Sequence, residues 1–227
     1  MAGVDRLYLV TVTARISYAG QVAAFLDLAE AAGVRHVTYL SVYNADQAPP
    51  EVDIAAVEAD LASRQGITHS ILRPAWFMQN FGDAHIPLID GVFAAPSGGG
   101  KEAFIDAADI AAVAAETLLD PEAHAGAVYS LTGPQALTHQ EVADIIAAVS
   151  GRPVAYHDID QEVWINTLIA AGVPAEYEVM MRWLTGAVIS GNGATPTGDV
   201  EKVTGRPATT FREFAERNAH VWTPEAK

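Results

Sequence analysis

Short apolar runs alternate along the chain with longer segments in which apolar residues recur at helical spacing. The short runs are typical of buried strands, and the periodic segments are typical of amphipathic helices. Strands are expected at residues 7–11, 34–40, 68–72 and 128–131. Helices are expected at residues 21–32, 52–64, 109–118 and 138–150, and the chain after Trp164 is mostly helical. This alternation predicts an α/β fold with a mainly parallel sheet and right-handed crossovers.

Two of these helices carry an N-terminal signal. Asp109 stands where its carboxylate is expected to cap the first free N–H groups of its helix. Thr138 and Glu141 have the spacing of a capping box, in which each side chain bonds the backbone of the other residue. Both signals support the predicted helix boundaries.

Composition narrows the class of protein. The 227 residues are enough for one α/β domain with a small C-terminal lobe. The formal net charge of −15 argues against nucleic acid and anionic membranes as partners, because both attract basic surfaces. The chain has no cysteine, which excludes disulfides and thiolate chemistry. No apolar run approaches the roughly 20 residues of a membrane span, and nothing resembles a signal peptide, so a cytoplasmic location is expected.

Six segments, in order, resemble the NmrA-like branch of the atypical short-chain dehydrogenases. They read GVDRLYLVT, AAGVRHVTYLS, ILRPAWFMQNF, AFIDAADIAAVAAETL, YSLTGPQALTHQEVADIIAAVSGRPV and TGRPATTFREFAERNA. The resemblance covers nearly the whole chain. It implies a Rossmann-like domain at residues 1–150 and a smaller, mostly helical lobe at 151–227, with parts of 75–105 contributing to the cleft between them.

The resemblance also predicts that the cofactor half of the fold is missing. In the family, the strand matching residues 7–11 is the fourth, and the first strand, the glycine-rich turn and the phosphate-binding helix precede it. The glycine cluster at 98–100 lacks the GxGxxG spacing, and Glu102 follows Lys101 where a P-loop needs Ser or Thr. We interpret that cluster as a structural turn.

The dehydrogenase dyad Tyr-x-x-x-Lys is absent as well, since the helix after Ser41 reads EVDIAAVEADLASRQG. A dinucleotide could be held only near Thr11, Ser41 and Pro74. The sequence therefore predicts no tight binding of NAD(P) and no required cofactor. Either the chain is a genuine truncated homologue, or it has been started too late, at an internal methionine.

Three functions remain open at this point. The leading hypothesis is a cofactor-independent isomerase, dehydratase, cyclase or coupling enzyme that acts on a hydrophobic aromatic or polyketide-like metabolite. The first alternative is an NAD(P)H-dependent reductase with a missing N-terminus, which would use NADPH. The second alternative is a non-catalytic regulator or accessory subunit, because NmrA-like proteins include regulators.

The aromatic segment after the third expected strand is the candidate substrate site. Open α/β sheets bind ligands at the carboxyl ends of their strands, and an aromatic wall suits a flat molecule. Ordinary packing between the two lobes is the alternative explanation for the two tryptophans of the helical lobe. The predicted substrate-binding residues are Ser41, Trp76, Phe77, Met78, Asn80, Phe81, Trp164 and Trp183.

Chemistry without a cofactor needs a general acid or base. Tyr43 follows the second expected strand, and His85 lies about one helical turn beyond the aromatic segment. A histidine titrates near neutral pH, so it suits proton transfer. Tyr43 and His85 are therefore the predicted catalytic residues. The histidines show no metal-ligand spacing, and no metal site is expected.

The first expected strand presents an unprotected edge. Leu7, Tyr8, Leu9 and Val10 carry no charge and no proline, and such an edge invites pairing with another chain. A two-fold homodimer that buries this edge or the helix beside it is expected.

Overall fold

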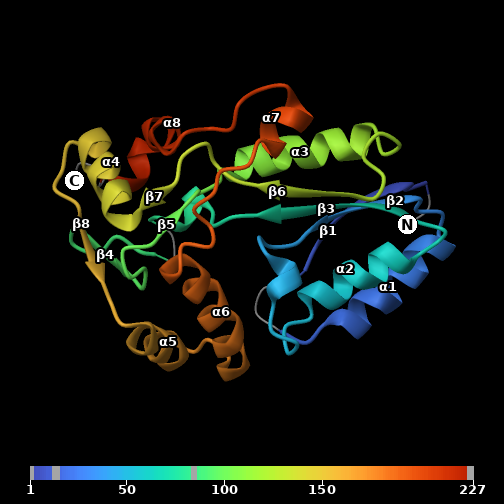
Figure 1. Ribbon diagram of the computed structural model, residues 1–227, viewed down its shortest axis with the longest axis horizontal. Coiled ribbons are helices and arrows are strands. Elements are labelled where there is room, and N and C mark those ends of the chain that lie inside the picture. The colour runs from blue at the N-terminus through green and yellow to red at the C-terminus, as the bar shows by residue number, and fades with distance from the viewer. Residues whose placement is uncertain (1–2, 12–15, 83–85, 224–227) are drawn as a thin grey trace.

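A computed structural model of the chain describes residues 3–11, 16–82 and 86–223. Its centre is a four-stranded parallel sheet in the order β1-β2-β3-β6 (Figure 1). The strands are β1 (Arg6–Val10), β2 (His36–Leu40), β3 (Thr68–Pro74) and β6 (Ala127–Leu131). The α/β fold with a mainly parallel sheet, predicted from the alternation of apolar runs, is confirmed.

Helices cover both faces of this sheet (Figure 1). α1 (Ala19–Ala31) and α2 (Ile54–Ser63) lie side by side on one face, while α3 (Ala107–Leu119) and the short α7 (Asp199–Thr204) lie on the other. Each helix buries its apolar side against the strands. Strands β2 and β3 are consequently covered on both faces, which explains why they read as continuous apolar runs.

The rest of the chain gathers beyond the carboxyl ends of the strands (Figure 1). Two small sheets stand there, one parallel and one antiparallel. They were not predicted, because their strands are only two to four residues long. The elements of this region are β4 (Val92–Ala95), β5 (Lys101–Glu102), β7 (Leu137–Thr138), α4 (His139–Ser150), β8 (Ala155–Asp158), α5 (Gln161–Ala170), α6 (Glu178–Ile189) and α8 (Phe211–Arg217).

Contacts join the part of the chain before residue 150 to the part after it. β4 pairs with β8 along Val92–Ala95, and α7 packs against α3. The lobe after residue 150 is thus tied to the first part by a sheet and by helix packing. The division at residue 150 stays a prediction.

Helix capping follows the sequence at one site and departs from it at another. Thr138 and Glu141 form both bonds of the capping box at α4, as predicted. The cap of α3 is Asp106, whose carboxylate accepts from the N–H of Ala108, so the prediction of Asp109 as the cap is wrong. Asp109 is fully buried one turn further on, where its carboxylate accepts hydrogen bonds from Arg206 and Thr209. It ties α3 to the C-terminal segment.

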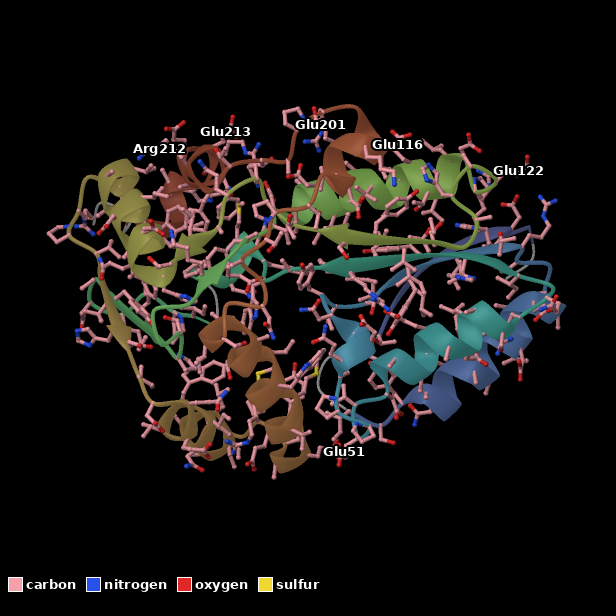
Figure 2. The ribbon with its side chains drawn as sticks, viewed as in Figure 1. Glu51, Glu116, Glu122, Glu201, Arg212 and Glu213 are labelled. Carbon is pink, nitrogen blue, oxygen red and sulfur yellow. The ribbon has the colours of Figure 1, made fainter. Side chains whose placement is uncertain are left out.

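Charged side chains mark the outside of the molecule. In Figure 2, Glu116 and Glu122 point outward from the side of α3, and Glu51 points outward from the opposite side. Among the described residues, no helix has the length and apolar character needed to cross a membrane.

Candidate functional site

The carboxyl ends of β2 and β3 bring the first candidates together. The N–H of Tyr43 donates to the carbonyl of Pro74 at 2.9 Å, and the N–H of Ala75 donates to the carbonyl of Leu131 at 2.9 Å. The chain thus continues in strand-like register past the assigned strand ends. Tyr43 and Trp76 leave the sheet at the same edge, which is where open α/β sheets bind ligands.

The hydroxyl of Ser41 is hydrogen-bonded within the protein. It donates to the Glu58 carboxylate at 2.5 Å, and Arg73 forms a forked ion pair with the same carboxylate at 3.0 and 2.5 Å. Ser41 itself is buried. This arrangement fixes the end of β2 against α2 and β3, and it leaves the serine hydroxyl without a free proton for a ligand.

The aromatic segment divides into a pocket residue and core residues. Trp76 lines a cavity and is only partly buried. Met78 and Phe81 are buried in a hydrophobic core, where the ring of Phe81 packs edge-on against those of Phe93, Phe104 and Phe211. A 3₁₀ turn at Met78–Asn80 causes this division, because it directs Met78 into the core. Phe77 packs against the core under α3, and Asn80 is half-buried.

The cavity beside Trp76 lies between the sheet end and the helical lobe. Its volume is about 10 Å³, roughly that of one water-sized sphere. Trp164 of α5 lines it and is buried, whereas Trp183 of α6 is half-buried and does not line it; the substrate-binding roles of both stay predictions. The lining residues are Trp76, Ile86, Ala95, Pro96, His139, Trp164, Thr185 and Val188.

Of the two predicted catalytic residues, only Tyr43 lies among the described residues. His85 lies outside the described residues. Tyr43 is half-buried at the sheet edge, and burial together with the nearby Glu102 raises the pKa of its phenol. The phenol therefore keeps its proton at neutral pH. Tyr43 can donate a hydrogen bond or a proton there, and it does not act as a base. The site roles of both residues stay predictions.

Glu102 was missed by sequence reasoning. It is 2% exposed on β5, and no salt bridge among the described residues involves it. Burial raises the pKa of its carboxyl group to about 7. Its carboxylate presses against Gly193, since a Cβ at that glycine would lie 1.9 Å from Oε2. The signal in the sequence was a single carboxyl residue followed by the apolar residues Ala103 and Phe104.

His139 was missed as well. It is the first residue of α4, and its ring packs against Phe81, Phe104 and Tyr156 with centroid distances of 5.3 to 5.5 Å. Burial lowers the pKa of its imidazole to about 4, so the ring is neutral at pH 7. The capping box was visible in the sequence, but the aromatic cage around this position comes from three other segments.

Backbone N–H groups that could hold a phosphate are already occupied. In the glycine cluster, the N–H groups of Ser97 and Gly98 donate to the Asp158 carboxylate at 2.9 and 3.1 Å. At the start of α1, the N–H groups of Tyr18 and Ala19 donate to the Asp53 carboxylate. The glycine cluster is thus a structural turn. These two turns therefore do not fit the pyrophosphate of a dinucleotide, because carboxylates of the chain already occupy their N–H groups.

No metal centre emerges from the part of the chain that the structure describes. Its histidine, aspartate and glutamate side chains form no group of three or more that could hold a metal ion.

Comparisons with known proteins identify relatives along the whole chain. The model of the NmrA-like family matches residues 1–216. The NAD(P)H azoreductase of Xenophilus azovorans is 35% identical over 222 residues, which is 96% of this chain and 77% of that protein. The NADPH-dependent quinone oxidoreductase of Escherichia coli, solved in complex with NADPH, has a TM-score of 0.79 at 29% identity and covers 95% of this chain, which matches 77% of that one.

The transcriptional regulator NmrA, solved with NAD, has a TM-score of 0.73 at 15% identity and covers 97% of this chain and 76% of that chain. At this identity the likeness shows the fold alone. It gives no support to the regulator hypothesis.

These relatives correct the leading functional hypothesis. The expectation of a non-redox enzyme without a cofactor is wrong, because relatives that match nearly the whole chain are named as an NAD(P)H azoreductase and an NADPH-dependent quinone oxidoreductase. With a family match from residue 1 to residue 216, the chain belongs to the NmrA-like family.

Proposed function

We propose that this chain forms the substrate-binding and nicotinamide-facing part of an NAD(P)H-dependent reductase. Its substrate would be a flat aromatic electron acceptor with neutral polar atoms, such as a quinone or an azo compound. The observation that carries the proposal is the match of nearly the whole chain to reductases of these two types, one of them solved with NADPH. The aromatic wall at Trp76 and Trp164 supports the substrate class.

NAD(P)H, when bound, supplies a hydride to such a substrate. The anion that results takes up a proton, and Tyr43 is the proposed donor because its phenol is protonated at neutral pH and stands at the sheet edge. The tyrosinate left behind is a strong base, so it recovers a proton from water. Glu102, whose carboxyl group lies near this tyrosine, sets the charge of its surroundings.

The test is a titration of the purified chain with NADPH, followed by an assay of NADPH consumption with a simple quinone. Micromolar binding and quinone-dependent loss of NADPH are expected from a competent reductase. If the chain binds NADPH but consumes none with either quinones or azo dyes, the proposed substrate class is wrong. If it binds no NADPH at all, the proposal fails for this chain.

We propose further that two copies of this chain pair through the β1 side of the molecule. Among the described residues β1 is an edge strand, with Tyr8 and Val10 37% and 53% exposed. Leu28 on α1, which covers the other face of the sheet, is 67% exposed and adds a second apolar side chain to this side of the molecule. Burying such surface contributes about 25 cal/mol per Å².

A cytoplasmic location also stays a prediction.

Light scattering measures this pairing directly. A dimer is expected at micromolar concentration, and Val10→Lys should dissociate it, because the variant places a charge on the exposed edge. Glu201→Lys is the control for the charge change, because Glu201 is exposed on α7, which packs at the β6 edge of the sheet, opposite β1 (Figure 2). A monomeric wild-type chain would contradict the proposal.

A further inference from the structure

The cavity between the sheet end and the helical lobe is too small for the proposed substrate. Its volume of about 10 Å³ is roughly that of one water-sized sphere. Trp76 and Pro96 line it from the first part of the chain, whereas Trp164, Thr185 and Val188 line it from α5 and α6. The carbon atoms of an aromatic ring stay about 3.5–4 Å from those of their neighbours. A ring can therefore enter this cavity only if its two sides separate.

The helices on one side of the cavity form a self-contained unit. Residues 160–192, the helical hairpin, comprise α5, α6 and the turn between them, and they lie beyond the carboxyl ends of the strands (Figure 1). Within the hairpin, Arg182 of α6 pairs with Glu162 of α5 and with Glu178. Every hydrogen bond and salt bridge that the hairpin makes with a described residue stays inside the hairpin. Polar contacts thus hold the hairpin together and do not attach it to the sheet.

The two later helices of the same lobe are attached differently. Arg206, which follows α7, donates to the buried Asp109 carboxylate, and Arg217 of α8 donates to the buried Asp106 carboxylate. Such charge-assisted hydrogen bonds require a definite geometry, so they fix α7 and α8 on α3. The hairpin has no comparable bond to the rest of the described chain, although it belongs to the same part of the sequence.

Apolar side chains hold the hairpin against the sheet end. Trp164, Ile165, Met180 and Met181 are buried in the core cluster that also contains Tyr39 of β2. Apolar contacts are non-directional, and methionine side chains adapt to different neighbours. Packing of this kind can separate and form again without leaving a polar partner unpaired.

The chain is fixed on both sides of the hairpin. Before it, the Asp158 carboxylate accepts from the N–H groups of Ser97 and Gly98. After it, the Gly193 carbonyl accepts from the N–H of Ala103 at 2.9 Å. Hinges are usually a few residues at the ends of elements. The residues between each fixed point and the nearest helix of the hairpin have this position.

We propose that the helical hairpin is a lid, which lifts from the carboxyl edge of the sheet to admit a flat aromatic substrate between Trp76 and Trp164. Opening separates non-directional apolar contacts, and closing buries them again around the ligand. Closure of this kind excludes water from a reaction site. The identity of the ligand in this inference rests on the proposed function, whereas the motion of the lid does not.

Introduced thiols test the motion, because the chain has no cysteine of its own. Val188 lines the cavity from α6 and is 2% exposed, and Val200 on the anchored α7 is 1% exposed. The rate at which dithiodipyridine modifies Val188→Cys and Val200→Cys measures how often each thiol reaches solvent. Val188→Cys should react at least about tenfold faster, because a lid opens locally while α7 becomes accessible mainly through global unfolding.

A second measurement adds azobenzene, a flat aromatic azo compound, without NADPH. Azobenzene should slow the modification of Val188→Cys, because its rings fill the gap beneath the lid. It should leave the modification of Val200→Cys unchanged. If Val188→Cys does not fold, Met181→Cys takes its place, since Met181 is a buried residue of the same helix.

The two measurements separate the lid from its ligand. Equal modification rates at the hairpin and at Val200→Cys overturn the lid. Fast modification at the hairpin that azobenzene does not slow supports the lid and contradicts the proposed class of substrate. Neither rate depends on NADPH, so fast modification in a chain that fails the reductase assay would contradict the proposed function alone.

Discussion

Two buried histidines, at opposite ends of the molecule, differ in how their nitrogens are used. His36 stands at the amino end of β2 and is 1% exposed; its Nδ1 lies 2.9 Å from the Thr68 hydroxyl and its Nε2 lies 3.3 Å from that of Ser70. His139 is about as buried, but its Nδ1 has no partner among the described residues and its ring borders a cavity. Burial lowers the pKa of both imidazoles to about 4. Burial and pKa therefore do not distinguish these two histidines. The hydrogen bonds of their ring nitrogens do.

The hollows at the two ends differ in the same way. The amino end of the sheet has the larger one, about 420 Å³, and three of the charged side chains that line it are paired. Arg35 pairs with Asp5 at 3.1 Å, and the Arg6 guanidinium donates to the carbonyls of Leu118 and Leu119 at the end of α3. The smaller cavity at the carboxyl end is lined in part by His139. Volume favours the amino end, whereas open α/β sheets bind ligands at the carboxyl ends of their strands.

The largest expected effect is on catalysis at the carboxyl end. Tyr43→Phe should lower the turnover of NADPH with a quinone by about 10²–10⁴-fold, because it removes the proposed proton donor. Tyr129→Phe is the matched control, since that phenol is paired with His124 at 2.7 Å near the amino end. Steady-state kinetics of both variants would measure the difference. If the Tyr43→Phe chain has wild-type turnover, a group other than the Tyr43 phenol donates the proton.

The next effect concerns Glu102 and pH. Its carboxyl pKa is raised from 4.5 to about 7, so the folded chain holds the proton more tightly than the unfolded chain does. The contribution of Glu102 to the free energy of unfolding is fully present below pH 4.5 and is lost as pH rises through 7. The loss lowers the free energy of unfolding by about 3 kcal/mol. Glu102→Gln should abolish this loss, so urea unfolding should show a more stable variant at about pH 8 and little change at about pH 4.

Glu58→Gln provides the contrast for that experiment. Glu58 is also buried, but its carboxylate is paired with Arg73. Removing one partner of a buried pair leaves the other uncompensated, so this variant should be destabilised. If Glu102→Gln is also destabilised near pH 8, the hydrogen bond between the Glu102 carboxylate and the Trp76 backbone outweighs the burial of the charge.

Phenylalanine substitutions at the two histidines should change stability in opposite directions. His36→Phe leaves the hydroxyls of Thr68 and Ser70 without their ring partner and should destabilise the fold by about 1–3 kcal/mol. His139→Phe removes an unpaired polar atom from an aromatic cage and should stabilise the fold by about 1 kcal/mol. Thermal unfolding of both variants would measure the two shifts. Destabilisation of similar size at both positions would remove the contrast between the two ends.

The smallest effect compares two capping boxes. Thr138 caps α4, directly before His139, and Thr210 caps α8. Replacing either threonine with alanine should cost about 1 kcal/mol of stability. Only Thr138→Ala should also shift the imidazole signals of His139 in NMR spectra, because it loosens the turn that holds the ring. Equal shifts in the two variants would show that the α4 cap does not position the ring.

Part of the candidate site could be predicted from the sequence. Tyr43 and Trp76 follow strands that the apolar pattern located, and the structure places both at the carboxyl edge of the sheet. Trp164, a candidate from the helical lobe, lines the cavity but is buried, so its role in binding stays a prediction. Met78 and Phe81 were grouped with them because they are neighbours in sequence, but the 3₁₀ turn sends them into the core. Which side chain faces a cavity depends on a turn of three residues, and periodicity cannot resolve so short an element.

The sequence by itself determined the α/β class, the four parallel strands and the family, because each depends on apolar periodicity or on motifs that are continuous along the chain. Only the tertiary structure decided that Asp106 and not Asp109 caps α3, that carboxylates occupy the backbone N–H groups at the glycine turn, and that Glu102 and His139 are buried among apolar groups. These properties depend on segments that lie far apart in sequence. A pKa or an unpaired nitrogen is set by what surrounds the atom in space, and the order of residues does not contain that directly.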